Sequence, residues 1–251
     1  MAERRSGVYA YTKSSTPCYS ALLKAGRFDE LLEVLALEPK PWWHDQQWVA
    51  KVLAARGDVD GAVQALERAR GANAPGGTIS VLAEEYLLAA GRADEAYQRS
   101  GTEAGRANTH IATFRNITKK YPGIEPQRIL SDLIASMPGD EGKWFATAKA
   151  LKQYDLAVKL AWHSPVDPKT FIRAARDHVK SRPGFAIETA LAALHWMAAG
   201  WGYELTGVEP REAREHALAA GDALQNRPAV EARIVDINAL AASAAAAPAS
   251  I

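Results

Sequence analysis

Residues Leu23–Leu31 read LKAGRFDEL, and the same arrangement of small, glycine and acidic residues returns twice along the chain. It returns as AARGDVDGA at Ala54–Ala62 and as AAGRADEA at Ala89–Ala96. The glycines of successive copies are 31 and then 34 residues apart. A motif that recurs every ~20–50 residues indicates a chain built from stacked copies of one supersecondary unit.

Each copy predicts a tight turn between two helices. Glycine takes the left-handed backbone conformation that ends a helix, because it has no Cβ to clash. The aspartate three residues later falls in the first turn of the next helix, where its charge faces the positive end of the helix dipole. A degenerate fourth copy, LKQYDLA at Leu151–Ala157, has its aspartate at the corresponding place. The residues assigned to these turns are Gly26, Asp29, Gly57, Asp60, Gly91, Asp94 and Asp155.

Amphipathic helices are predicted on both sides of these turns. Apolar residues recur at i, i+3, i+4 and i+7, and no alternating strand pattern competes with them. Prolines mostly lie between the apolar stripes, where they interrupt one helix or start the next. The sequence therefore predicts an all-α chain of about seven antiparallel helix pairs, at roughly 17–38, 45–70, 78–100, 107–137, 141–163, 168–200 and 209–246.

The composition limits the partners and the cell compartments that suit this chain. Thirty Lys and Arg against 29 Asp and Glu give a net charge of +1, which leaves no global field to attract nucleic acid or an anionic membrane. Cys18 is the sole cysteine, so an internal disulfide and a cysteine-rich zinc site are excluded. Neither a signal sequence nor a run of about 18 apolar residues is evident. We therefore expect a cytoplasmic protein without a membrane segment.

The turns resemble tetratricopeptide repeats, whose period is about 34 residues. Three later stretches are similar to an uncharacterised family of bacterial helical-repeat proteins: NTHIATFR at 108–115, PGDEGKWFATAK at 138–149 and RAARD at 173–177. The resemblance implies a right-handed α-α superhelix, a TPR-like solenoid, but it implies no activity. We expect one helical-repeat domain over 17–246, with a polar segment at 1–16 before it and a tail at 247–251 after it.

Motifs for catalysis, cofactors or metals are not evident. The stretch GDEGK at Gly139–Lys143 ends like a phosphate-binding loop, but Met137 occupies the place of its first glycine, and Trp144 replaces the Ser or Thr that would hold magnesium. We interpret it as a helix start whose Trp144 packs between neighbouring pairs. Paired acids such as Glu84 and Glu85 are interpreted as solvated. We therefore predict no catalytic residue, no cofactor and no metal site.

Aromatic residues supply the first candidate binding surface. Trp42, Trp43 and Trp48 lie within seven positions, more than one helix face requires. They either fill the gap between helices or form a hot spot for a partner. A second cluster with the same two interpretations consists of His195, Trp196, Trp201 and Tyr203.

Basic residues supply the second candidate surface. Residues 101–182 carry 14 Lys and Arg against 8 Asp and Glu, a net charge of +6, whereas 183–251 carry 4 against 8, a net charge of −4. The basic side chains either line one groove or are dispersed over separate solvated faces. The candidate binding residues, aromatic and basic, are Trp42, Trp43, His110, Arg115, Lys143, Arg173, Arg176 and His195.

Three functions remain open. The first is a scaffold or adaptor for an unknown protein or peptide, because stacked helix pairs form an extended concave surface without a reactive centre. The second is a nucleic-acid-associated accessory role that uses the basic segment 101–182. The third is an enzyme with a pocket between helix pairs, which would require groups such as His110, Arg115 and Asp177 to converge.

Overall fold

The computed structural model describes residues 15–38, 41–70 and 76–246, and every regular element in these ranges is a helix. The all-α prediction is therefore confirmed for this part of the chain. Most of the expected segment 1–16 and all of the expected tail 247–251 lie outside the described residues. Internal contacts divide the chain into unit 1, Met1–Arg106 with Asn116–Ile124, and unit 2, Ala107–Arg115 with Glu125–Ile251.

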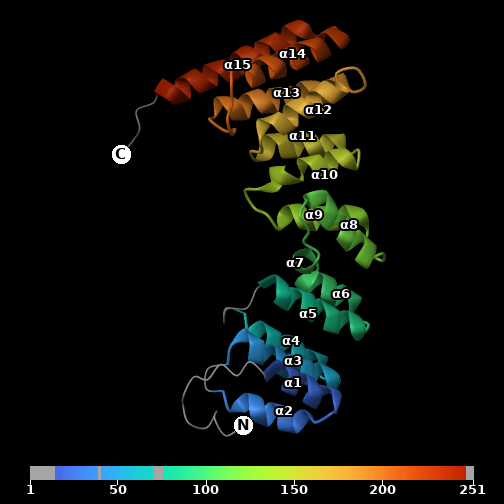
Figure 1. Ribbon diagram of the computed structural model, residues 1–251. Coiled ribbons are helices and arrows are strands. Elements are labelled where there is room, and N and C mark those ends of the chain that lie inside the picture. The colour runs from blue at the N-terminus through green and yellow to red at the C-terminus, as the bar shows by residue number, and fades with distance from the viewer. Residues whose placement is uncertain (1–14, 39–40, 71–75, 247–251) are drawn as a thin grey trace. The chain divides into compact units, whose positions relative to one another are not determined.

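Unit 1 is a series of helical hairpins (Figure 1). Consecutive helices pack on one another, and α1 also packs on α3. The predicted apolar stripes are buried, with Leu31, Leu66 and Leu87 fully enclosed. The elements are α1 (Ser15–Lys24), α2 (Phe28–Ala36), α3 (Trp43–Ala55), α4 (Val59–Arg68), α5 (Gly76–Ala89), α6 (Ala93–Ala96), the π-helical turn η2 (Tyr97–Gly101), α7 (Thr102–Ala104) and the C-terminal part of α8 (His110–Lys120).

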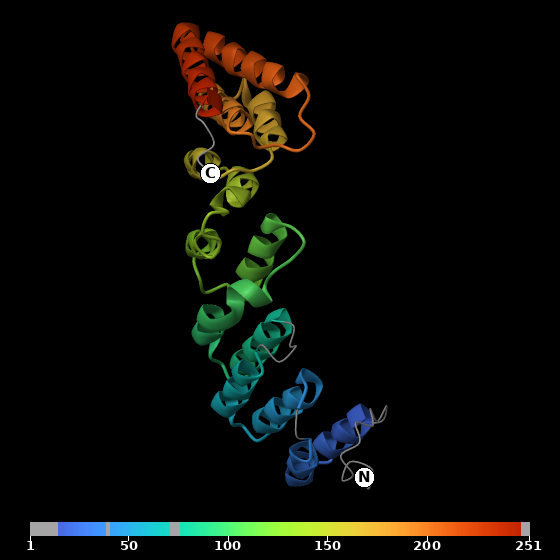
Figure 2. The same cartoon turned by 90° about the vertical axis from the view of Figure 1, so that its left-hand side faces the viewer.

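In the C-terminal part of unit 2, α12 and α13 each pack both on the next helix and on the next but one. The pairs α12 with α13 and α14 with α15 are in contact, and so are α11 with α13, α12 with α14, and α13 with α15. Two views at right angles show these helices lying side by side (Figures 1 and 2). Besides the first part of α8, the elements are α9 (Pro126–Ala135), the 3₁₀ turn η3 (Glu141–Trp144), α10 (Phe145–Ala150), α11 (Tyr154–His163), α12 (Pro168–His178), α13 (Pro183–Ala198), α14 (Val208–Ala223) and α15 (Arg227–Ala246).

The three repeat glycines lie in the turns between helices. The φ angles of Gly26, Gly57 and Gly91 are +68°, +83° and +74°, all in the left-handed region. The N–H after Gly57, that of Asp58, donates to the carbonyl of Leu53 at 2.9 Å and closes the end of α3. This bond satisfies a carbonyl group that the helix end would otherwise leave without a partner.

The turn aspartates also join neighbouring hairpins. Asp29 and Asp60 each lie in the first turn of a helix, as the repeat predicts. Asp29 pairs with Arg56 of the next turn at 2.5 Å, and Asp60 pairs with Arg92 of the turn after that at 2.8 Å. Both aspartates are exposed, so each pair adds little to stability but repeats the same link from one hairpin to the next.

We expect Gly57→Val to lower the free energy of unfolding by about 1–2 kcal/mol, because a β-branched residue is strained at a left-handed φ. No heavy atom lies within 4 Å of the position that a Cβ would take, so the cost comes from the backbone alone. Urea unfolding followed by circular dichroism measures it. An unchanged transition midpoint would contradict the assigned turn.

The degenerate fourth copy makes its turn without glycine. Lys152 follows α10 with φ +60°, and the N–H of Gln153 donates to the carbonyl of Ala148 at 2.9 Å. This is the hydrogen bond that Asp58 makes to Leu53 after Gly57. An exposed lysine thus holds the backbone conformation that glycine holds in the first three copies.

Lys152→Gly should therefore raise the free energy of unfolding by up to about 1 kcal/mol, since it removes the steric cost of a Cβ at positive φ. The greater freedom of glycine in the unfolded chain opposes part of this gain. Thermal unfolding of the variant beside Lys149→Gly, which places glycine inside α10, separates the two effects. Destabilisation of equal size by both substitutions would show that position 152 has no special conformation.

Candidate functional site

The tryptophans at the start of α3 divide into buried and exposed residues. Trp48 is buried in unit 1, and its ring contacts the ring of Tyr19 edge-on, with 5.8 Å between centroids. Trp43 is half-buried, whereas the side chain of Trp42 is 58% exposed. Core packing therefore accounts for Trp48, and Trp42 presents its ring to solvent.

The stretch that ends like a phosphate-binding loop forms the 3₁₀ turn η3 in unit 2. Trp144 and Phe145 are buried, and the ring of His110 lies edge-on to that of Trp144 at 4.6 Å. Lys143, the residue that would bind phosphate, pairs with Asp140 at 2.8 Å. Packing in the core thus accounts for Trp144. The ammonium of Lys143 is paired with a carboxylate of the same turn, that of Asp140.

Glu141 is the first residue of the same turn, and its carboxylate is ionised. Its pKa is lowered because the backbone N–H groups of Glu141 and Gly139 donate to the carboxylate, and His163 adds a smaller effect. The Nε2 atom of His163 lies 3.5 Å from Oε1. Three polar atoms of η3 and α10, Oε2 of Glu141, Nε1 of Trp144 and Oγ1 of Thr147, are buried without a hydrogen-bond partner in the described chain.

Several of the basic residues in 101–182 are neutralised locally. Lys120 lies 2.6 Å from Glu84, Arg128 lies 3.8 Å from Asp132, and Arg176 lies 3.1 Å from Asp177. On α12, Arg173 donates to the carbonyl oxygen of Lys169 at 3.1 Å, while Arg115 is exposed on α8. Lys120, Arg128 and Arg176 are therefore each matched by a nearby carboxylate.

Glu84 is a buried carboxylate in unit 1, contrary to its interpretation as a solvated residue. Its side chain is 3% exposed and accepts hydrogen bonds from Lys120 at 2.6 Å and from the hydroxyl of Tyr121 at 2.5 Å. Burial, followed by the neighbouring Glu84, raises the pKa of Tyr121, so the phenol remains protonated and donates. The ring of Tyr97, in the π-helical turn, lies 5.2 Å from that of Tyr121.

Gly101 allows these two tyrosines to meet. A Cβ at this position would lie 2.9 Å from the ring of Tyr97 and 3.4 Å from that of Tyr121. The hydroxyl of Ser100, in the same turn, is buried without a partner among the described residues. Single π-helical turns are often found at functional positions. Here the turn packs Tyr97 against Tyr121, whose hydroxyl donates to Glu84 and joins the end of α8 to α5.

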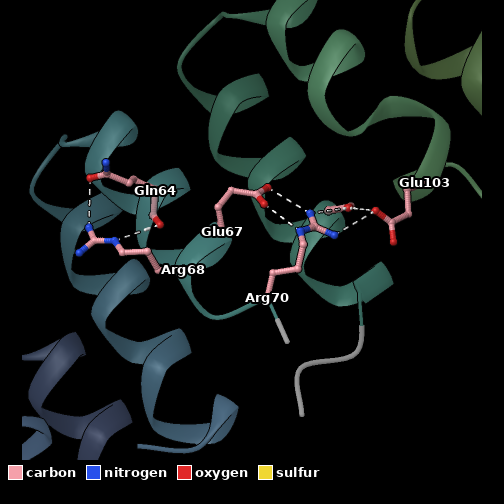
Figure 3. Close-up of polar contacts among 6 residues, drawn as sticks. Gln64, Glu67, Arg68, Arg70 and Glu103 are labelled. Atoms are coloured by element: carbon pink, nitrogen blue, oxygen red, sulfur yellow. Dashed lines mark hydrogen bonds and ion pairs between the residues drawn. The ribbon is translucent and has the colours of Figure 1, made fainter. Parts of the chain in front are cut away.

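A second polar network in unit 1 centres on Arg70, just after α4 (Figure 3). Arg70 donates twice to Glu67, at 2.8 and 3.0 Å, and reaches Glu103 on α7 at 3.4 Å. Ser80 on α5 donates to Glu103 as well. The hydrogen bonds to Arg70 lower the pKa of Glu67. Because its guanidinium is held by two carboxylates of its own unit, Arg70 serves packing rather than the binding of an anion.

His195 belongs to an aromatic cluster between helices of unit 2. Its ring lies 5.4 Å from that of Trp162 on α11 and 4.9 Å from that of Trp196. Trp196 donates to the carbonyl of Ala161 at 2.7 Å, and Trp162 donates to Glu188 at 3.1 Å. These contacts make His195 an interhelix residue.

Trp201 and Tyr203, predicted in one cluster with His195, lie apart from it in the loop between α13 and α14. Their side chains are 53% and 79% exposed. Lys169 on α12 donates to the carbonyl oxygens of Tyr203 and Glu204, at 3.4 and 3.5 Å. The loop thus holds two large aromatic side chains in solvent on a backbone that is fixed from a neighbouring helix.

The structure does not gather the candidate binding residues into one site. Trp42 and Trp43 belong to unit 1, and the others to unit 2, on α8, η3, α12 and α13. Within the described ranges, no three His, Cys, Asp or Glu side chains are placed to hold a metal ion. Nor does any helix of that part of the chain have the length and apolar character needed to cross a membrane.

The loop aromatics, the strongest candidate surface, could be recognised only in part from the sequence. From the sequence, the cluster of His195, Trp196, Trp201 and Tyr203 had two interpretations, core packing or a hot spot, and only the structure shows which of these rings face solvent. The chain matches no protein-family model, no curated protein and no solved structure.

Proposed function

We propose that this chain is a protein-binding scaffold or adaptor. In this proposal each unit is a segment of a right-handed TPR-like superhelix, and together they supply about seven helix pairs. Contacts between a helix and the next but one, as between α12 and α14 and between α13 and α15, support this arrangement. So do the left-handed turns that close successive hairpins.

The observation that carries the proposal is the fixed loop that exposes Trp201 and Tyr203. Large aromatic residues in solvent cost hydration free energy, and in proteins they are enriched at the centres of interfaces. Two groups that could carry chemistry are instead engaged by neighbours of unit 1: the buried Glu84 by Lys120 and Tyr121, and the exposed Arg70 by two glutamates. Binding therefore fits the surface better than catalysis does.

Nucleic-acid association is the second candidate function. A nucleic-acid surface needs cations that remain available to phosphate. Lys120, Lys143 and Arg176 each have a carboxylate partner instead. A cytoplasmic location and kinship with the uncharacterised bacterial family are part of the same proposal, and both remain predictions from the sequence.

The experiment that tests the proposal is capture followed by reconstitution. The purified full chain is used as bait in host lysate, with and without nuclease, and each enriched protein is then purified and titrated against the chain by calorimetry. We expect a defined stoichiometry that survives nuclease treatment and depends weakly on salt. Binding that disappears with nuclease and falls steeply with salt would favour the nucleic-acid alternative. Failure of every purified candidate to bind would count against a scaffold.

A further inference from the structure

The hairpin turns of unit 1 neutralise one another. Arg56 pairs with Asp29 of the turn before it, and Arg92 pairs with Asp60 in the same way. The cation of each later turn thus faces a carboxylate of the earlier one. An anionic partner of this part of unit 1 would have to displace those carboxylates.

In unit 2, the start of α9, the turn between α10 and α11 and the turn between α12 and α13 lie side by side. The side chain of Gln153 donates to that of Gln127 at 2.6 Å. The ring of Tyr154 lies 5.5 Å from the ring of His178, and the guanidinium of Arg182 lies 4.1 Å from the centre of the same ring. We refer to these segments, residues 125–128, 149–155 and 176–182, as the turn edge.

The turn edge carries positive charge that its own carboxylates do not match. It has six Lys and Arg against three Asp and Glu, a net charge of +3. Lys152 and Lys180 are exposed and have no ion-pair partner within the described residues. Arg182 belongs to the turn after that of Asp155, but its guanidinium lies over the ring of Tyr154 rather than against the aspartate. The neutralising pattern of unit 1 is therefore not repeated, and these lysines are available to an anion.

Lys152 places its charge on the turn edge at a cost to the backbone. Its φ of +60° is the left-handed conformation that glycine takes in the first three copies of the repeat. This conformation costs more for a residue with a Cβ than for glycine. The turn itself ends a helix in the ordinary way, so the feature that lysine adds over glycine is its exposed ammonium. Backbone strain tends to persist where it serves binding.

An acidic protein segment suits the turn edge better than a nucleic acid does. Glu125, Asp155 and Asp177 are interspersed among the cations, and a nucleic acid, charged at every phosphate, would pass close to them. A peptide can place carboxylates beside the lysines and uncharged residues beside the acids. The sole Tyr of the turn edge, Tyr154, already contacts His178, Arg182 and Phe185, which leaves little of its ring for stacking with a base.

We propose that the turn edge of unit 2 binds an acidic segment of a partner protein, with Lys152 and Lys180 as the cations that recognise its carboxylates. The two lysines come from neighbouring turns, so the segment runs across the ends of the helix pairs. The inference rests on the protein-binding function proposed above and specifies the charge of the partner.

Fluorescence anisotropy with two labelled peptides of equal length tests this proposal on the full chain. In one peptide glutamate alternates with glycine and serine, and in the other glutamine replaces each glutamate. We expect the glutamate peptide to bind in preference, and added salt to weaken its binding because exposed charges are screened. Lys152→Gly combined with Lys180→Ala should weaken it by about fivefold. Glycine at position 152 removes the ammonium and keeps the turn, so this variant folds.

The matched control removes two cations from unit 1, by Lys24→Ala combined with Arg68→Ala. Both side chains are exposed, and Arg68 donates only to Gln64 (Figure 3). The control lowers the net charge by the same amount as the test variant. It should change binding of the glutamate peptide by less than about twofold, because the turn edge is intact.

Each other outcome overturns the proposal. Equal binding of the two peptides would show that charge does not select the ligand. Equal losses in the test and control variants would show attraction to the whole chain rather than to the turn edge. Preference for single-stranded DNA or anionic lipid vesicles, offered as competitors at equal charge, would identify a different ligand. Absence of binding would exclude this occupant, yet a partner found by capture would still support a scaffold.

Discussion

Lys120→Met should lower the free energy of unfolding by about 2–3 kcal/mol, because it removes the cation that faces a buried carboxylate. The Nζ atom of Lys120 lies 2.6 Å from Glu84, whose side chain is 3% exposed. Methionine keeps the apolar stem but leaves only the hydroxyl of Tyr121 to satisfy the charge. The lysine itself is 39% exposed, and solvent screening places the effect at the lower end of the range for broken buried pairs. Urea unfolding followed by circular dichroism measures the loss.

Two further variants separate charge from packing. Glu84→Gln in the Lys120→Met background should recover most of the lost stability, since a neutral carboxamide still accepts from Tyr121 and needs no cation. Lys119→Met changes the neighbouring exposed residue of α8 and should alter stability by less than about 0.5 kcal/mol. If the glutamine recovered nothing, the cost would belong to the stem of Lys120 rather than to the unpaired charge.

The hairpin turns are the part of the fold that local sequence encodes well. At Gly26, Gly57 and Gly91 the residue type and the required backbone angle coincide, so the signal lies within a few neighbouring positions. The turn after α14 has no such signal. There Gln225 takes φ +53°, and the N–H of Asn226 donates to the carbonyl of Gly221 at 2.9 Å. Hydrogen bonding by the chain, rather than residue type, sets that conformation.

The polar contacts between residues far apart in sequence could not be predicted in the same way. Glu84 meets Tyr121 across 37 positions of sequence, and Arg70 meets Glu103 across 33. A charged residue on a helix is usually solvated, and Glu84 was interpreted in this way. The interpretation is wrong because the end of α8 packs beside Glu84 and buries its carboxylate. Trp201 is the reverse case, an apolar residue that is exposed. It lies between two glycines with positive φ, Gly200 and Gly202, which fix the loop and turn its side chain outward.

Gly142→Ala should lower the free energy of unfolding by about 3 kcal/mol, because the added Cβ has no room. It would lie 2.3 Å from the carbonyl oxygen of Ser164 and 2.9 Å from its Oγ. The first of these is a backbone atom, which cannot rotate away as a side chain would. The N–H of Gly142 also donates to Oγ of Ser164 at 2.6 Å. Relief of the clash therefore stretches a buried hydrogen bond and adds to the loss.

The sign of this effect distinguishes close packing from helix propensity. Alanine favours a helical turn over glycine by up to about 1 kcal/mol, so without the contact Gly142→Ala would stabilise the chain. Gly184→Ala near the start of α13 is the matched control, since no heavy atom lies within 4 Å of its Cβ position. It should be neutral or slightly stabilising in the same urea titration. Stabilisation by both substitutions would show that η3 does not approach Ser164 closely. If it does, hydrogen exchange at η3 and around Ser164 should be faster in the Gly142→Ala variant and unchanged in the Gly184→Ala variant.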